Sequence, residues 1–210
     1  MSEKPTTQKF YDRIADVHNL MMSINGYRAS VAKCLRSIGL RIDENSLVLD
    51  AGCGTGIVTL GFYAAHFRPH RTFAVDLSLN SLKIAEEQFQ TDDETDDANV
   101  CLVQGNVLRL PFADETFDLI ISCGVLEYIS IEEGLREFSR VLKKDAKLVL
   151  IPVRPSFIGS ILEVLYKFKT HSIAETERIA ERYFQIDGNY KFSITEPLGW
   201  SKQVFLWRKK

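Results

Sequence analysis

Short apolar runs and amphipathic stretches alternate along this chain. The apolar runs have the length and β-branched content of buried strands, and they cover residues 46–50, 72–76, 99–104, 117–122 and 147–152. Between them, apolar residues recur at helical spacing over about 55–66, from Ser78 or Asn80 to about Gln90, and over about 131–142. Strands that alternate with helices predict a parallel sheet with helices on both faces, a doubly wound α/β fold.

The two ends of the chain predict additional elements. Residues 5–39 have the pattern of two helices, the second with Val31 and Leu35 on one face and an end at Gly39, and we expect both to lie across the mouth of the sheet. Beyond residue 152 the pattern predicts helices at 156–168 and 172–184, then strands at 189–196 and 201–208 that form a terminal hairpin.

The chain is long enough for one domain with a sizeable core. We predict that residues 1–210 are that domain, with four parts: a helical cap at 1–40, a core at 45–152, an insertion at 153–172, and a final helix and hairpin at 173–210.

Composition narrows the function classes. The net charge of −2 gives no global attraction to nucleic acid or anionic lipid, and no Asn-Pro-Pro-Tyr base-flipping motif is present. No signal peptide opens the chain and no Cys-x-x-Cys pair occurs, so we expect a cytoplasmic location. The four cysteines and four histidines lack metal-ligand spacing, so we predict no metal. The acidic stretch at 91–97 has the composition of a solvated loop.

The first strand leads into the chain's most informative segment, Asp50-Ala51-Gly52-Cys53-Gly54-Thr55-Gly56. Glycine permits left-handed backbone angles and close approach of a ligand, and the amides at the start of the following helix can face a polar group. The dinucleotide-binding fingerprint would place its third glycine at Ile57, which argues against NAD. On the spacing alone, an ordinary tight turn remains an alternative.

This segment resembles motif I of the class I S-adenosylmethionine-dependent methyltransferases, aliphatic-aliphatic-Asp-x-Gly-x-Gly-x-Gly. Residues from about 45 to 151 are similar to the methyltransferase type 11 group, also described as ubiquinone/menaquinone methyltransferase-like. The resemblance implies a Rossmann-like sheet of seven strands in the order 3-2-1-4-5-7-6 with the last strand antiparallel. It also implies that S-adenosyl-L-methionine is the cofactor.

In a doubly wound sheet, ligands bind at the carboxyl ends of the strands. Asp76 ends the second strand, where a carboxylate can accept hydrogen bonds from both ribose hydroxyls, although it can also cap the next helix. Asn106 stands where the family has an acid that accepts from the adenine amino group, and its amide oxygen can still accept. The candidate cofactor contacts are Tyr11, Asp50, Gly52, Cys53, Gly54, Gly56, Asp76, Leu77, Asn106, Val107 and Cys123.

Several of these residues also fit a purely structural role. Tyr11 begins a segment that matches the family's Tyr-Asp-x-x-Ala motif, in which the tyrosine covers the cofactor. An aromatic residue that only packs on the apolar face of the first helix is an equal alternative for Tyr11. Cys123 lies in a turn that the family places under the sulfonium, yet Cys53 and Cys123 both fit as small buried fillers. Arg28 is a weaker candidate for the carboxylate of the cofactor.

Candidate catalytic residues follow the fourth strand. A sulfonium methyl group is already a strong electrophile, so the protein mainly has to align a nucleophile and exclude water. Many relatives carry a histidine after this strand, whereas this chain has Val125-Leu126-Glu127-Tyr128. Glu127, Tyr128 and His18 are therefore the candidates for an acid–base or orienting role. A charge at a helix start and a lid contact are the alternatives for Glu127 and Tyr128.

The predicted helix within 157–168 carries an apolar stripe. With Met21, Met22 and Ile24 it would form a pocket wall for a small apolar acceptor such as a quinone, or it would simply pack on the sheet. We predict a small-molecule methyltransferase; a cofactor-binding protein without transfer activity is the alternative. No paired acidic polyamine site supports an aminopropyl transferase. We expect no nucleic-acid partner, and the locally basic C-terminal third leaves membrane contact open.

Overall fold

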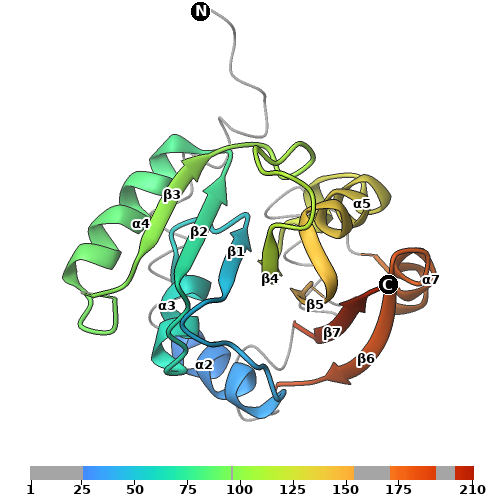
Figure 1. Cartoon of the computed structure of the whole chain (residues 1–210), viewed down its shortest axis with the longest axis horizontal. Helices are drawn as coiled ribbons and strands as arrows, with labels where there is room; N and C mark the ends of the chain where they lie inside the picture. Colours follow the sequence, from blue (N-terminus) through green and yellow to red (C-terminus); the bar gives the residue numbers. More distant parts are fainter. Residues whose placement is uncertain (1–25, 96, 154–170, 193–201) are drawn as a thin grey trace, which may run out of the picture.

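The structure is a computed structural model, and it describes residues 26–95, 97–153, 171–192 and 202–210. The framework is a seven-stranded sheet in the order β3-β2-β1-β4-β5-β7-β6, as predicted (Figure 1). The strands are β1 (Leu47–Ala51), β2 (Arg71–Asp76), β3 (Val100–Gln104), β4 (Phe117–Cys123), β5 (Leu142–Ile151), β6 (Phe184–Tyr190) and β7 (Val204–Lys209).

The first five strands pair in parallel, and β7 is antiparallel to both β5 and β6. The ends of β1 to β4 lie within one residue of the predicted bounds. The carboxyl ends of the parallel strands therefore meet at one edge of the sheet, where a doubly wound fold binds its ligands.

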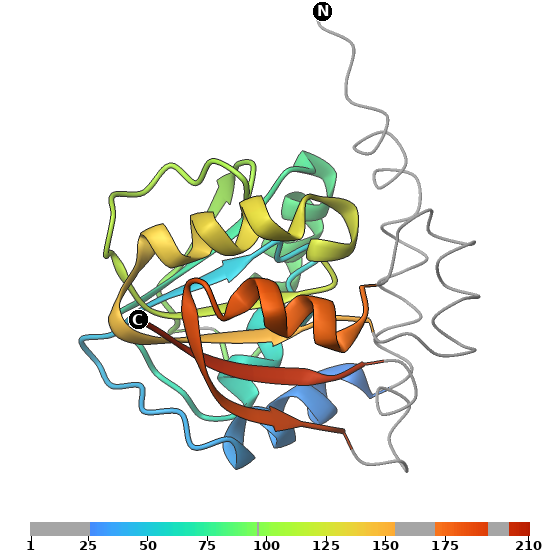
Figure 2. The ribbon, with the colours of Figure 1, turned by 90° about the vertical axis from the view of Figure 1, so that its right-hand side faces the viewer.

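Helices cover both faces of the sheet. One face carries α2 (Tyr27–Ser37), α3 (Ile57–Ala64) and α4 (Leu79–Thr91); the other carries α5 (Ile131–Val141) and α7 (Ile173–Ala180), seen together in Figure 2. Side chains alternate between the two faces along each strand. In β1, Val48 packs with α2 and α3, whereas its neighbour Leu49 packs with α5. Each face thus has its own apolar core.

Helix α5 holds the chain segment that follows β3. Its first turn is capped by Ser130, whose hydroxyl accepts from the Glu133 amide, and its apolar face is buried. Near its other end, Arg140 donates to the carbonyl oxygens of Phe112 at 2.9 Å and Leu110 at 3.1 Å. Glu137 accepts from the Leu110 amide at 2.7 Å. These bonds fix the loop that carries Asn106 and Val107.

The boundaries of β6 and β5 were predicted wrongly. Strand β6 lies at Phe184–Tyr190 rather than 189–196, because the Asp187-Gly188 pair, which reads as a turn, is a bulge inside the strand. Helix α7 ends at Ala180, which leaves room for the earlier strand. Strand β5 begins at Leu142 rather than 147, because Leu142 already pairs with Phe117 before the register shifts.

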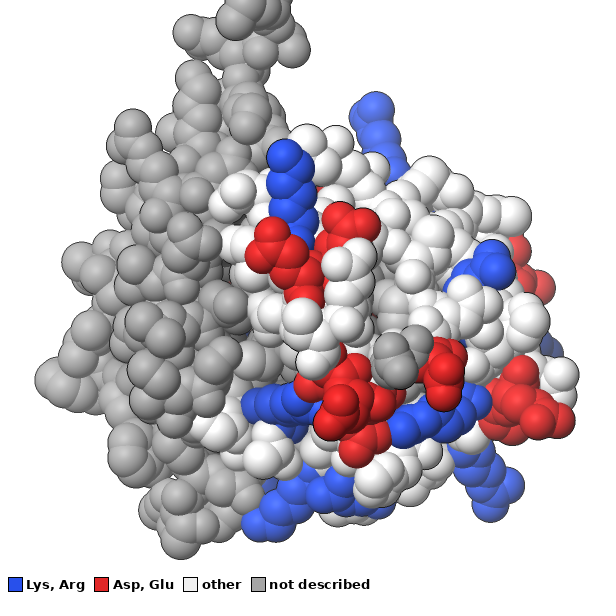
Figure 3. All heavy atoms as spheres, turned by 90° about the vertical axis from the view of Figure 1, so that its left-hand side faces the viewer, with Lys and Arg blue, Asp and Glu red and all other residues white. Residues whose placement is uncertain are grey.

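Within the acidic stretch at 91–97, three residues are bonded to other parts of the protein, which the composition of a solvated loop does not predict. Asp92 accepts from both terminal guanidinium nitrogens of Arg28, and Glu94 accepts from Arg68 at 2.7 Å. The Thr95 hydroxyl is buried and donates to the Phe89 carbonyl at 2.8 Å. Acidic and basic side chains accordingly intermingle on this side of the molecule (Figure 3). Arg28 therefore joins α2 to the end of α4 and does not point to a ligand.

Some predicted features lie outside the described residues: Tyr11, His18, the stretch that includes Met21, Met22 and Ile24, and the stripe at 157–168. The division into a cap, a core and an insertion stays a prediction. No described helix has the length and apolarity needed to cross a bilayer.

Candidate cofactor-binding site

A glycine loop links β1 to α3 at the carboxyl edge of the sheet. Gly52, Gly54 and Gly56 have φ values of 77°, 54° and 87°, all in the left-handed region that favours glycine. An added Cβ at Gly52 would collide with the Val125 side chain, and one at Gly56 would lie 2.6 Å from the Phe89 ring. At Gly54 the same position meets no atom of the described residues within 4 Å, so that part of the protein leaves the space beside Gly54 open.

Most amides of the loop are used inside the protein. Those of Gly52 and Cys53 donate to the Val75 carbonyl at 2.8 and 2.9 Å, and that of Gly56 donates to the Cys53 carbonyl at 2.9 Å. Helix α3 then begins with no side-chain cap at its N-cap residue, Gly56. The loop therefore shapes the site, and the amides left for a polar ligand belong to the first turn of α3.

Asp76 connects this loop to α4. One carboxylate oxygen accepts from the Gly54 amide at 2.8 Å, and the other accepts from the Ser78 amide at 2.8 Å. The cap of α4 is Ser78, whose hydroxyl accepts from the Ser81 amide at 3.2 Å, so the capping role considered for Asp76 belongs to Ser78. Leu77, beside it, is 40% exposed.

The segment after β3 lies against the same strand end, because the Gly105 amide donates to the Asp76 carbonyl at 2.9 Å. Asn106 is exposed, and its side-chain oxygen accepts from the Leu108 amide at 2.9 Å. An amide oxygen has a second lone pair, so it can still accept from a ligand. The Val107 side chain is buried in the core, which leaves only its backbone for a ligand.

Asp50 is buried at the end of β1, with 2% of its surface exposed. Its carboxylate accepts from the Thr59 hydroxyl of α3 at 2.6 Å. Burial raises the pKa of Asp50 from 3.8 to about 7, and the negative charge of Asp76 adds to the effect against the opposing Thr59 bond. The end of β1 therefore gains or loses a proton close to neutral pH.

This proton has a measurable effect on stability. The folded chain keeps it up to about pH 7, whereas the unfolded chain releases it near 3.8. We therefore expect the free energy of unfolding without cofactor to fall as pH rises from about 4 to about 7, by up to about 4 kcal/mol from this group, and then to level off. Asp50→Asn, which can still accept from Thr59, should lose that pH dependence. Urea unfolding of both proteins between about pH 4 and pH 7 measures this dependence. If the free energy of unfolding changes with pH equally in the two proteins, the expectation is wrong.

The two candidate cysteines differ in their surroundings. The Cys53 thiol is buried among apolar residues beside α3 and α4, and burial raises its pKa, which agrees with a filler role. Cys123 ends β4, and its sulfur lies 2.8 Å from the hydroxyl of Tyr27, the first residue of α2. Burial raises the pKa of the Cys123 thiol and, still more, that of the Tyr27 hydroxyl. Both groups are therefore neutral at pH 7.

Glu127 lies just beyond β4 in the short helix η1 (Leu126–Tyr128), with 6% of its surface exposed. One carboxylate oxygen, Oε1, accepts from the Val153 amide. The other, Oε2, is buried and has no hydrogen-bond partner among the described residues. The Tyr128 amide donates to the Val125 carbonyl at 3.0 Å, which closes the turn, and its side chain is half-buried.

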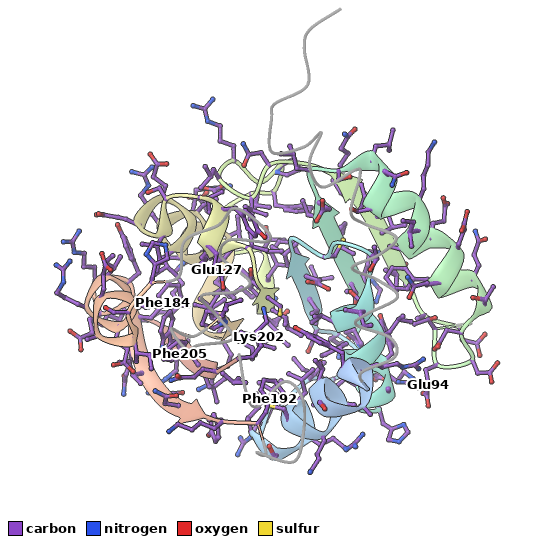
Figure 4. All side chains as sticks on the ribbon, turned by 180° about the vertical axis from the view of Figure 1, so that it is seen from behind. Glu94, Glu127, Phe184, Phe192, Lys202 and Phe205 are labelled. Carbon is purple, nitrogen blue, oxygen red and sulfur yellow. The ribbon has the colours of Figure 1, made fainter. Side chains whose placement is uncertain are left out.

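The sequence interpretation missed two residues at this edge, Tyr27 and Lys202. Tyr27 is 2% exposed, and its signal was its place on the apolar face of α2. Lys202 is 8% exposed, and its only signal was a charge directly before the apolar run of β7. Figure 4 shows Glu127 and Lys202 near the centre of the molecule. No group of three or more His, Cys, Asp and Glu residues able to hold a metal occurs within the described ranges.

Comparisons with known proteins agree with this geometry. A methyltransferase domain model matches residues 49–150. An uncharacterised protein of Methanocaldococcus jannaschii is 32% identical over 79% of this chain and 69% of its own length. The demethylmenaquinone methyltransferase of Anoxybacillus flavithermus is 29% identical over 75% of this chain and 67% of its own length. The chain thus spans about two thirds of each relative.

A solved structure confirms the fold. The geranyl diphosphate C-methyltransferase of Streptomyces coelicolor, in complex with S-adenosyl-L-homocysteine, superposes with a TM-score of 0.72 at 17% identity, over 87% of this chain and 76% of that one. Together with the matching domain model and relatives, the glycine loop and the strand order assign S-adenosylmethionine as the cofactor. The chain belongs to the class I S-adenosylmethionine-dependent methyltransferases, in the methyltransferase type 11, ubiquinone/menaquinone methyltransferase-like group.

Proposed function

We propose that this methyltransferase acts on a small, apolar ring compound and that the methyl group is transferred in line at the carboxyl edge of the sheet. The observation that carries the proposal is the buried Glu127 carboxylate, with one oxygen unpartnered, just beyond the end of β4. Burying a charged group without a partner is costly, which favours a role toward a ligand. The name of the Anoxybacillus relative, a demethylmenaquinone methyltransferase, supports a ring acceptor.

The residues of this edge fit the parts of the cofactor. In this proposal Asp76 accepts from the ribose hydroxyls, and Asn106 accepts from the adenine amino group; the bond from the Gly105 amide to the Asp76 carbonyl, which holds the two residues next to each other, supports this. The open space beside Gly54 leaves room for the ligand. Asp50 and Cys123 end the two central strands, β1 and β4, and would face the sulfonium and the amino acid portion.

The bound cofactor supplies an activated methyl group. The chain then has to orient the acceptor, exclude water and manage a proton. Glu127 is the candidate to accept that proton, with Tyr128 as an orienting group. His18 and Tyr11 stay candidates from the sequence alone, as does a cap over the acceptor formed by residues 153–172.

Transfer of a labelled methyl group tests this function. The protein is incubated with methyl-labelled S-adenosylmethionine and either a series of reduced naphthoquinones or a cell extract. We expect label in a small apolar product, and label only in a polar or macromolecular product would contradict the acceptor class. Tight binding of S-adenosylhomocysteine with no labelled product in any mixture would support the alternative, a binding protein without transfer activity. That alternative rests on the absence of the usual histidine at the Glu127-Tyr128 position.

A further inference from the structure

Two oppositely charged side chains are buried at the same edge of the sheet. Glu127 and Lys202 are each more than nine-tenths buried. They come from parts of the chain that are far apart in sequence, the turn after β4 and the residue pair before β7. Neither burial is explained by packing alone, since Glu and Lys are almost never fully buried unless they are paired.

Backbone contacts place the two side chains close together. Val153, whose amide donates to Glu127 Oε1, forms an antiparallel bridge with Lys202. The Lys202 side chain reaches over the end of β4. Its Nζ lies 3.1 Å from the position that a Cβ added to Gly124 would take. Both charges also act on the neighbouring Cys123 thiol: Lys202 lowers its pKa and Glu127 raises it, within a net increase caused by burial.

The two charges do not satisfy each other. No ion pair within the described part of the chain joins Glu127 to Lys202, and Glu127 Oε2 has no hydrogen-bond partner. Burying two opposite charges that do not contact each other costs free energy of folding. Such a cost is expected where a ligand completes the arrangement, and the missing group must donate to a carboxylate and accept from an amine at once. A hydroxyl group does both.

We propose, on the basis of the function proposed above, that Glu127 Oε2 and Lys202 Nζ bind the reacting hydroxyl of the acceptor, and that they select ring acceptors with an acidic hydroxyl. The hydroxyl donates to Oε2, and its oxygen accepts from Nζ. The O–H bond then breaks, the proton moves to Oε2, and the electron pair stays on the oxygen beside Lys202. That electron pair, or the ring carbon it activates, forms the bond to the methyl carbon while the carbon–sulfur bond breaks and its electrons remain on sulfur. After transfer to a ring carbon, that carbon releases its hydrogen as a proton to solvent, and the electrons of the carbon–hydrogen bond restore the aromatic ring.

The other titratable groups that face this pair are few. The Tyr27 hydroxyl from α2 and the Cys123 thiol from β4 both have raised pKa values and stay neutral. The Asp50 carboxyl from β1 acts on both of these groups and has a pKa of about 7. Above about pH 7, the Asp50 carboxyl therefore adds a negative charge to this edge of the sheet.

Ionisation of a bound ring hydroxyl tests the proposal without turnover. The full-length protein, saturated with S-adenosylhomocysteine, is titrated with naphthol, its dihydroxy analogue and the methyl ether of each, and absorbance reports the ionised form. We expect the hydroxyl compounds to bind at least about 10-fold tighter than the ethers. We also expect the pKa of the bound hydroxyl to lie about one unit or more below that of the same compound in water. Lys202→Met should remove both effects, whereas Lys202→Arg should keep most of the pKa shift.

Glu127→Gln separates a ligand role from a structural one. Glutamine keeps an oxygen for the Val153 amide, so the turn should hold. Loss of the negative charge should lower the pKa of the bound naphthol further, opposite in sign to Lys202→Met, while labelled transfer falls about 100- to 10,000-fold. Lys191→Met, which removes an exposed charge just after β6, is the matched control and should change neither quantity.

Equal binding of hydroxyl compounds and ethers, no binding of either, or an unchanged pKa in Lys202→Met would overturn the proposal. The experiments distinguish a failure of this hydroxyl subsite from a failure of the proposed transfer function. If naphthol ionises in a Lys202-dependent manner but no acceptor is ever labelled, the hydroxyl subsite stands and the transfer function is wrong. If labelled product forms from rings without a hydroxyl, the transfer function stands and the subsite is wrong.

Discussion

Asp76→Ala is expected to weaken the binding of S-adenosylhomocysteine at least about 100-fold and to lower the free energy of unfolding by about 2 to 4 kcal/mol. The carboxylate accepts from the amides of Gly54 and Ser78, so the substitution leaves the glycine loop and the start of α4 without their common anchor. It also removes the acceptor proposed for the ribose hydroxyls. Both changes weaken the binding of the same ligand: the first alters the shape of the glycine loop, and the second removes a direct hydrogen-bond acceptor.

Calorimetric titration and urea unfolding measure the two effects of Asp76→Ala separately. Asp93→Ala is the matched control, because it removes an exposed carboxylate from the segment after α4 and should leave both quantities unchanged within about 0.5 kcal/mol. If Asp76→Ala destabilises the chain but binds the ligand with unchanged affinity, Asp76 is only a structural residue and the ribose role is wrong.

Alanine at Gly52 and at Gly54 should give different results. Both residues have left-handed backbone angles, but within the described ranges the added Cβ collides with a neighbour at Gly52, the Val125 side chain, and not at Gly54. We expect Gly52→Ala to cost about 2 to 4 kcal/mol of folding stability, and Gly54→Ala about 1 kcal/mol, from backbone strain alone. Both variants should bind S-adenosylhomocysteine at least about 10-fold more weakly.

The Gly54 variant is the more informative of the pair. The space beside Gly54 is open in the protein, so a loss of affinity with nearly intact stability means that the ligand occupies this space. Thermal unfolding gives the stability of each variant, and calorimetry on the same samples gives its affinity for S-adenosylhomocysteine. A Gly54→Ala protein that binds as tightly as the wild type would place the ligand elsewhere. Gly52→Ala/Val125→Ala should recover part of the lost stability, because the colliding side chain is shortened.

The sequence predicts the parallel strands well because they depend on local patterns, whereas the order of the seven strands came from the family resemblance. Buried strands read as short apolar runs, and topology brings the last residue of each parallel strand to the ligand edge, which is why Asp50, Asp76 and Cys123 are candidate cofactor contacts. The bulge in β6 was missed because Asp187-Gly188 has the chemistry of a turn, and only pairing with β7 makes it part of a strand.

Lys202 and Tyr27 show the limit of such reasoning. Tyr27 reaches the edge from helix α2, and Lys202 reaches it from the chain just before β7; the position of each depends on long-range packing against the end of β4. The charge of Lys202 gives no periodic signal, and nothing in the sequence distinguishes Tyr27 from any other aromatic residue on the apolar face of a helix. Glu127 was recognised by its place after the fourth strand, but its unpartnered oxygen is visible only in the structure.

We propose that one edge of the sheet binds an adenosyl sulfonium between the glycine loop, Asp76 and Asn106. Calorimetric titration of the wild-type chain with S-adenosylhomocysteine, with Asp76→Ala titrated alongside, measures this binding. We expect saturable heat at one site per chain in the wild type and at least about a 100-fold weaker site in the variant. No heat of binding in the wild type, or equal affinity in the two proteins, would contradict it.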